Sequence, residues 1–394
     1  MRVALFQEAK SLSPYLEDIF FQLHKNPELG GQEYKTQAFI LAELEKMGIE
    51  AKPIAETGVL GIIRGEKPGK TVAFRADMDA LPVMEETGLD YKSQTPGVMH
   101  ACGHDAHVTI LLGAAKLLAA RKDSLQGNIK LFFQPNEEGT GGAQRMIQAG
   151  CMENPAVDAV FFGHCTPDHP VGTVGVCAGS TSAASNAFTV TFRGKGTHGA
   201  HPNAGTDVIV AACQAVTALQ TICSRRISPL DSAVVTVGAF HAGTVGNILP
   251  ETATIDGIIR TLTPETRVRA KEAFCQIVSG VAAAMGVTAE IDLRDGYAAT
   301  VNDEEMTGLT IEAAQTLLGK DNVYTNEKPT LGTEDIGYFL QEAPGCYYKL
   351  GVGDVETGDK AYPLHNPRFV VDLKALPYGV ALYVQIAENF LKEG

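Results

Sequence analysis

The sequence predicts an α/β protein in which a main domain with a largely parallel sheet is interrupted by a smaller α+β domain. Two observations predict this fold class. Through most of the chain, short apolar runs bounded by Gly, Pro or Asn alternate with amphipathic segments, which is typical of parallel α/β sheets. In the middle of the chain, apolar and polar residues alternate within the runs, as in half-buried strands.

The main domain is expected to begin with helices over residues 14–24 and 32–47, the second of which ends at Gly48, a usual helix terminator. Four apolar runs then predict strands, at residues 71–74, 129–133, 159–162 and 347–350. Further helices are expected over residues 108–120 and 142–149. This alternation indicates a layered domain with a mostly parallel sheet.

The middle of the chain predicts a different order of elements. Phe188, Val190 and Phe192 alternate with polar residues in a first strand, and Thr263 followed by Pro264 marks a helix start. The remaining elements are a helix over 207–222, strands near 232–239, 252–261 and 288–293, and the end of the second helix near 285. The resulting β-α-β-β-α-β order is the signature of a ferredoxin-like sandwich. We place this insert at 184–296, which splits the main domain into 1–183 and 297–394.

The composition excludes several classes of protein. The 394 residues include 32 Lys and Arg against 46 Asp and Glu, a net charge of −14, so neither nucleic acid nor an anionic membrane surface is an expected partner. The apolar stretches are judged too short for a transmembrane helix. Glu8 interrupts any signal-peptide core, and the eight cysteines form no CxxC pair. We therefore expect a cytoplasmic protein with reduced thiols.

Three of the predicted strands lead into side chains that can bind a metal. Those side chains are Asp77 and Asp79, Glu137 and Glu138, and His164. Ligand sites in open α/β sheets gather outside the carboxyl ends of strands, so these groups are expected to converge.

A fourth segment carries a thiol and an imidazole. Cys102 and His104 flank Gly103 shortly before a predicted helix, and together they suit Zn²⁺ and related ions. For this segment alone, a buried thiol beside a helix-capping histidine is an equal alternative. The acids and the histidine at the strand ends favour the metal site.

Four motifs occur in order along the chain: RADMDALP at 75–82, MHACGHDAH at 99–107, FQPNEEG at 133–139 and LHNPRF at 364–369. Together they resemble the dimetal amidohydrolases that include hippurate hydrolases, N-acyl-amino-acid amidohydrolases and auxin-conjugate hydrolases. These are relatives of the aminoacylase-type zinc carboxypeptidases. The resemblance covers nearly the whole chain. It implies a zinc-exopeptidase-like catalytic domain and an inserted lid and dimerisation domain.

The resemblance implies two divalent metal ions that share a bridging ligand and a bridging water. The implied ligands are Cys102, His104, Glu138, His164 and His365. Cys102 matches the bridging position, where the wider superfamily usually has Asp. Sulfur at this position favours Zn²⁺, with Mn²⁺, Co²⁺ or Ni²⁺ as alternatives.

The resemblance also implies a general base. Glu137 would take a proton from the metal-bound nucleophile and pass it to the leaving amine. The alternative for Glu137 and Glu138, two solvent-facing acids in a loop, is disfavoured beside the other ligands. Asp79 and Asp77 would orient the ligand histidines.

Three residues of the insert match groups that act on the substrate. His198 matches a histidine that, in the family, reaches across a dimer interface and stabilises the oxyanion. Asn247 and Arg260 match substrate-holding groups, and an Arg fork suits a carboxylate. A surface ion pair is the alternative for Arg260. The roles of three further residues stay open: His107, for which a hydrogen-bonded core position is the simpler interpretation, His201 and Glu334.

We therefore predict a metal-dependent amidohydrolase, active as a homodimer, that cleaves an N-acyl amino acid or a peptide-like small molecule. A carboxypeptidase or dipeptidase of the same family is the alternative among enzymes. From other classes, the alternatives are a catalytically silent dimer that binds metal or a small acid, and a redox sensor acting through Cys102. Glu137 argues against the silent dimer, because binding alone requires no free base.

Overall fold

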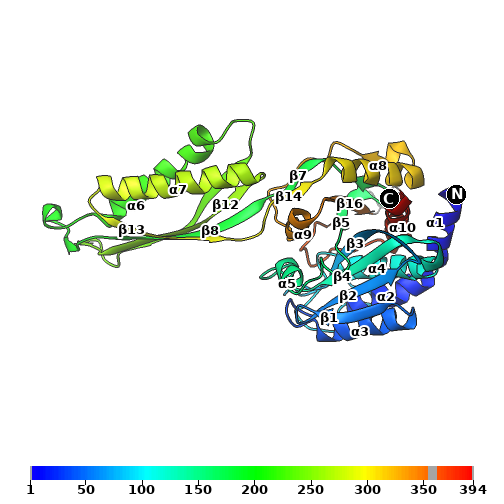
Figure 1. Cartoon of the computed structure of the whole chain (residues 1–394). Helices are drawn as coiled ribbons and strands as arrows, with labels where there is room; N and C mark the ends of the chain where they lie inside the picture. The colour runs from blue at the N-terminus through cyan, green and yellow to red at the C-terminus, as the bar shows by residue number, and fades with distance from the viewer. Residues whose placement is uncertain (1, 354–361, 393–394) are drawn as a thin grey trace. The chain divides into compact units, whose positions relative to one another are not determined.

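The computed structural model describes residues 2–353 and 362–392, which form two compact units (Figure 1). Unit 1 comprises Met1–Gly179, Val301–Lys328 and Asp335–Gly394. Unit 2 comprises Ser180–Thr300 and Pro329–Glu334. The insert predicted at 184–296 lies within the longer segment of unit 2, whereas no sequence pattern indicated that residues 329–334 return to this unit.

Unit 1 contains an eight-stranded sheet in the order β1-β2-β4-β3-β5-β16-β6-β15. The strands are β1 (Glu50–Ile54), β2 (Gly58–Arg64), β3 (Lys67–Asp77), β4 (Gln126–Gln134), β5 (Ala159–Pro170), β6 (Val174–Gly175), β15 (Val323–Tyr324) and β16 (Gly345–Gly353). The central strands β4, β3, β5 and β16 pair in parallel, whereas β1 and β2 extend the sheet antiparallel. The predicted largely parallel α/β sheet is confirmed.

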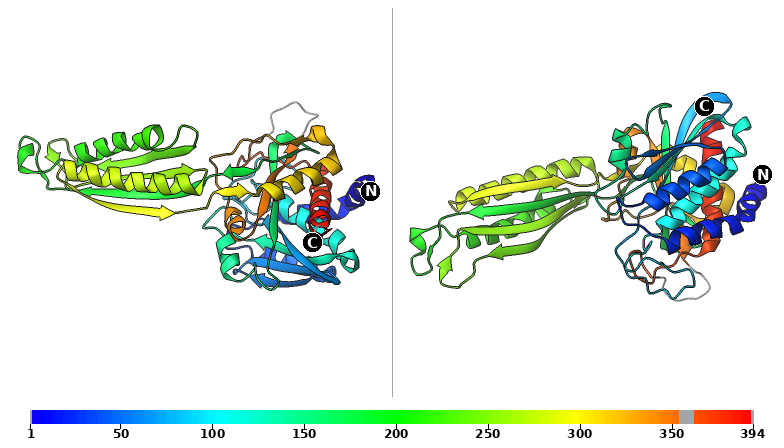
Figure 2. Two further views of the ribbon diagram at one scale, coloured as in Figure 1. Left: turned by 45° about the horizontal axis from the view of Figure 1, so that its top comes forward. Right: turned by 90° about the horizontal axis from the view of Figure 1, so that it is seen from below.

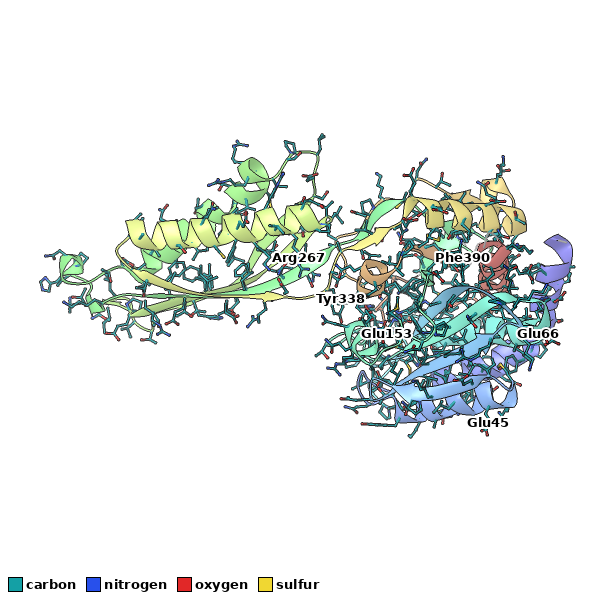
Figure 3. All side chains as sticks on the ribbon, viewed as in Figure 1. Glu45, Glu66, Glu153, Arg267, Tyr338 and Phe390 are labelled. Carbon is teal, nitrogen blue, oxygen red and sulfur yellow. The ribbon has the colours of Figure 1, made fainter. Side chains whose placement is uncertain are left out.

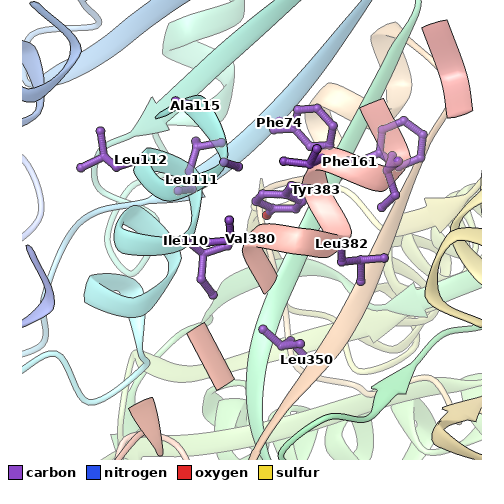
Figure 4. Close-up of a cluster of buried hydrophobic side chains, with 14 of the residues drawn as sticks. Phe74, Ile110, Leu111, Leu112, Ala115, Phe161, Leu350, Val380, Leu382 and Tyr383 are labelled. Carbon is purple, nitrogen blue, oxygen red and sulfur yellow. The ribbon is translucent and has the colours of Figure 1, made fainter. Parts of the chain in front are cut away.

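Helices cover both faces of this sheet. They are α1 (Arg2–Ser11), α2 (Ser13–Lys25), α3 (Tyr34–Lys46), α4 (His104–Ala119), α5 (Ala143–Gln148), α8 (Glu304–Leu318), α9 (Gly337–Glu342) and α10 (Leu376–Lys392). Alternate strand residues serve opposite faces, because Val72 and Phe74 join one buried cluster and Ala73 joins the other. Helices α4 and α10 lie side by side on one face (Figure 2), and their side chains pack against Phe74 and Phe161 (Figure 4).

Unit 2 contains a four-stranded antiparallel sheet in the order β10-β12-β8-β13 with two helices. Its elements are β8 (Ala184–Arg193), α6 (Val208–Leu219), β10 (Ala233–Ala242), β12 (Thr252–Thr261), α7 (Pro264–Ala284) and β13 (Thr288–Asp295). The predicted ferredoxin-like order is confirmed. The Thr263 hydroxyl caps α7 by accepting the Thr266 N–H at 3.1 Å. Arg267 of α7, labelled in Figure 3, donates to Asn186 on β8 at 3.0 Å.

One helical segment contradicts the expectation that every apolar stretch is too short to span a bilayer. Val208–Arg226 has 19 residues and a mean hydropathy of 1.3, which meets the length and composition of a membrane span. Its Ala211, Ala212 and Ala215 are nevertheless buried in the core of unit 2. Because core helices of folded domains have the same length and composition, this segment is weak evidence for a membrane span.

Candidate metal centre

The metal-ligating face of His104 is fixed at the start of α4. Gly103 has a left-handed φ of 81°, and α4 begins at His104, four residues before its predicted start. The Nδ1–H of His104 donates to the backbone oxygen of Asp79 at 2.9 Å. Nε2 is therefore the ring nitrogen that is left to bind a metal.

Cys102 and His164 meet from different elements. Cys102 precedes the left-handed Gly103, and His164 lies on β5. The Sγ of Cys102 is 3.6 Å from Nε2 of His164. The Nδ1–H of His164 donates to its neighbour's backbone oxygen, that of Cys165, at 2.7 Å, so its Nε2 is also available as a ligand.

Glu138 and His365 complete the cluster. Nε2 of His365 lies 3.0 Å from Oε1 of Glu138, which in turn lies 4.0 Å from Nε2 of His104. His365 has a left-handed φ of 66°, and its N–H donates to the backbone oxygen of Ala101 at 2.8 Å. The structure thus brings together in unit 1 all five residues predicted as metal ligands.

The chemistry of these donors fits divalent cations. Within the described ranges, Nε2 of His104 is buried without a hydrogen-bond partner, and Oε1 of Glu138 is buried with an ion-pair contact to His365 but no hydrogen bond. Burial raises the pKa of the Cys102 thiol well above its usual range, and the carboxylates of Glu138 and Glu137 raise it further. Burial raises the pKa of Glu138, but His365 and His104 outweigh this effect and lower it. A cation beside these groups would satisfy the open atoms and favour the thiolate.

Asp79 holds the backbone that carries both glutamates. Its Oδ1 accepts the N–H of Glu137 and its Oδ2 accepts the N–H of Glu138, each at 3.0 Å. Glu137 is 6% exposed and its carboxylate lies close enough to Cys102 to raise the thiol pKa. Asp79 therefore orients His104 through its backbone oxygen and the two glutamates through its carboxylate.

Asp77 orients a histidine other than the predicted ligands. Its Oδ1 accepts from Nδ1–H of His107 at 2.6 Å, and Nε2 of His107 accepts the N–H of Cys165 at 2.9 Å. Both nitrogens of His107 are engaged, so this histidine has no atom free for a metal. The Oδ2 of Asp77 nevertheless lies 3.5 Å from Nε2 of His104, at the edge of the cluster.

Sequence reasoning missed a buried ion-pair network beside the site. Arg75, which is fully buried, donates to Asp77 and to Asp335, each at 2.9 Å. Asp335 also accepts the N–H groups of Gly142 and Ala143 at 3.0 and 3.1 Å. Arg75 stands in the motif at 75–82, but no local pattern indicated that it pairs with Asp335.

The predicted substrate residues lie in unit 2. His198 is on β9 (Thr197–His198), which pairs with β11 (Ile248–Leu249), and the N–H of Gly199 donates to the Asn247 backbone oxygen at 2.8 Å. The Nδ1 of His198 accepts the Ala200 N–H at 3.1 Å, which leaves the proton on Nε2. Arg260 on β12 forms no ion pair within the described ranges, and its buried Nη1 has no hydrogen-bond partner there.

The layered α/β unit and its cluster of thiol, imidazole and carboxylate donors define a metal-dependent hydrolase. Residues 73–389 match the model of peptidase family M20/M25/M40. The chain is 40% identical over 391 residues to thermostable carboxypeptidase 2 of Saccharolobus solfataricus, covering 98% of both chains. It is 41% identical over 367 residues to N-acetyl-L-cysteine deacetylase of Bacillus subtilis, covering 93% of this chain and 86% of that one.

A solved structure of a dinuclear metal-binding peptidase of the M20 family from Bacillus subtilis superposes with a TM-score of 0.85 at 32% identity, covering 97% of this chain and 99% of that chain. The chain belongs to peptidase family M20/M25/M40. The predicted resemblance is confirmed, and the protein is a metal-dependent amide hydrolase with a two-metal centre.

Proposed function

We propose that this protein hydrolyses the amide bond of N-acyl amino acids and that Glu137 is its general base. The observation that carries the proposal is the pair Glu137–Glu138, held by the carboxylate of Asp79 so that Glu138 faces His104 and His365. One glutamate then serves as a ligand and its neighbour as the group that transfers the proton.

The metal ligands in this proposal are Cys102, His104, Glu138, His164 and His365. Two divalent ions would polarise the amide carbonyl and acidify the attacking water. Glu137 takes the proton of that water and returns it to the leaving amine. We propose Zn²⁺ as the metal, because thiolate and imidazole donors favour it, and elemental analysis of the purified protein tests this choice.

The substrate class follows from the relatives. The Bacillus subtilis relative is named as a deacetylase of N-acetyl-L-cysteine, and the Saccharolobus solfataricus relative as a carboxypeptidase. Both names imply a substrate with a free α-carboxylate, which the guanidinium of Arg260 and the amide of Asn247 are suited to bind. N-acetyl and N-benzoyl amino acids are expected to give higher kcat/KM values than dipeptides. The reverse order would establish the carboxypeptidase instead.

Replacing Glu137 tests the mechanism. Glu137→Gln keeps the size of the side chain but removes the base, so kcat is expected to fall by about 10²- to 10⁴-fold. The bound metal, measured by elemental analysis, is expected to be unchanged. Turnover that survives this substitution would refute the role of Glu137, and metal lost together with turnover would make it a ligand.

We also propose that the protein acts as a homodimer in which His198 donates a hydrogen bond from Nε2 to the substrate oxyanion in the partner's site. Support comes from the proton position, since Nδ1 of His198 accepts the Ala200 N–H and the exposed Nε2 is the donor.

A further inference from the structure

The turn that carries Glu137 and Glu138 is held from a second side by a buried acid of the N-terminal segment. Glu33, which immediately precedes α3, is fully buried. Its Oε1 accepts the N–H of Asn136 at 2.8 Å, and its Oε2 accepts the hydroxyl of Thr57 at 2.6 Å. Glu33 lies outside the residues that match the family model, which begins at residue 73.

Asn136 occupies a conformation that needs such support. Its φ of 54° lies in the left-handed region, which is uncommon for a residue with a side chain. Its side-chain oxygen packs so closely against Gly30 and Gly139 that a Cβ at either glycine would collide with it. The N-terminal segment and the turn are therefore fitted to each other.

Two carboxylates together hold three successive backbone N–H groups. Glu33 accepts from Asn136, and Asp79 accepts from Glu137 and Glu138. The direction of each N–H fixes the peptide planes of the turn, and the peptide planes fix where the two glutamate side chains begin. Loss of either carboxylate would leave a buried N–H without an acceptor and release the turn.

We propose that Glu33 is a positioning residue of the reaction, which acts by holding the Asn136 N–H and so placing Glu137 and Glu138. This inference rests on the proposed role of Glu137. In this role Glu33 contacts neither substrate nor metal, and it places Glu137 and Glu138 through the backbone of the turn.

The test compares substitutions of Glu33 in the metal-loaded enzyme. Glu33→Ala is expected to lower kcat by about 10- to 100-fold with little change in KM, because ground-state binding does not require the base. Zinc binding to the metal-free protein, measured by calorimetry, is expected to weaken about tenfold, because Glu138 shares the turn. Glu33→Gln is expected to retain most of the activity, since its amide oxygen can accept from Asn136 while the Thr57 hydroxyl turns to accept from its NH₂.

Two matched controls separate positioning from general destabilisation. Thr57→Val removes the other contact of the same carboxylate and leaves the Asn136 contact. Glu43→Ala removes a buried carboxylate on α3 that accepts the Tyr15 hydroxyl at 3.0 Å. Both are expected to lower the melting temperature and to leave kcat within about twofold of wild type.

The proposal is overturned if Glu33→Ala keeps wild-type kcat, if Glu43→Ala loses as much activity, or if Glu33→Gln is as impaired as Glu33→Ala. Should Glu33→Ala fail to fold, Glu33→Asp replaces it, because the shorter acid keeps the charge but withdraws its carboxylate from the Asn136 N–H by one methylene, so kcat is expected to fall as well. If the wild-type enzyme cleaves no N-acyl amino acid, the proposed function fails, and the zinc titrations alone still decide the role of Glu33.

Discussion

Single residues at the metal centre act as much through backbone groups as through side chains. Asp79 accepts the His104 Nδ1–H with its backbone oxygen and two N–H groups with its carboxylate. The sequence could place Asp79 near the metal, because it follows a predicted strand in a family motif. It could not indicate which atoms of Asp79 accept these hydrogen bonds, because that depends on contacts between separate segments.

His24 gives stability a defined pH dependence. Burial lowers its pKa, but the carboxylates of Asp105 and Glu85, at 2.6 and 3.3 Å, outweigh burial and raise it to about 9. A raised pKa means that the folded state binds the proton more tightly than the unfolded state. The ion-paired His24 therefore stabilises the folded state by an amount on the order of 3 kcal/mol. This contribution is fully present below about pH 6.5 and is lost as the pH rises through 9.

The measurement is urea unfolding of wild type and of His24→Gln across this range. The difference in the free energy of unfolding between them is expected to shrink as the pH rises from about 6.5 to above 9. His241→Gln, a substitution at an exposed histidine of unit 2, serves as the control. A difference that stays constant with pH would contradict the ion-paired state of His24.

At the scale of elements, periodicity located strands better than it located helix starts. The predicted run 129–133 falls within β4, because strand residues are apolar and end abruptly at polar groups. The start of α4 was misplaced because its residues from His104 to Ala115 are all buried, so no amphipathic period marks the first turn. Helix α1 was missed for a related reason, since its sequence has no pronounced apolar face.

The cap of α7 yields a prediction for unit 2. Thr263→Ala removes the hydroxyl that accepts the Thr266 N–H, and we expect a loss of about 1 kcal/mol in the free energy of unfolding. Thr263→Ser keeps the hydroxyl and is expected to cost much less. Chemical denaturation of both variants checks this, and equal losses would show that the hydroxyl is not the stabilising group.

For the whole molecule, the sequence indicated four of the five proposed ligands through the motifs at 99–107, 133–139 and 364–369, and His164 through its place at the end of a predicted strand. It did not predict the contact between Glu33 and Asn136, which lie 103 residues apart, because local patterns report secondary structure and not which loops meet. The pairing of Arg75 with Asp335 was not predicted for the same reason.

The proposed dimer makes a prediction about mixed subunits. Glu137→Gln and His198→Ala are each expected to be inactive alone. A mixed dimer contains one site with an intact Glu137 and a partner that presents an intact His198. Equal mixing with free subunit exchange should therefore restore about a quarter of wild-type activity. A mixture that stays inactive although mixed dimers form would show that His198 acts within its own chain, and a His198→Ala variant that is active alone would show that His198 has no catalytic role.

The order of strands in unit 1 also constrains how the chain is completed during synthesis. Strand β16 pairs with β5, yet residues 180–300, most of unit 2, are made between them. Until residue 353 leaves the ribosome, β5 has an unsatisfied edge that can pair with other chains. The main segment of unit 2 is continuous in sequence, so unit 2 can fold independently during this time. We therefore expect chains that are stalled before β16 to associate through the open edge of β5 more readily than the complete chain.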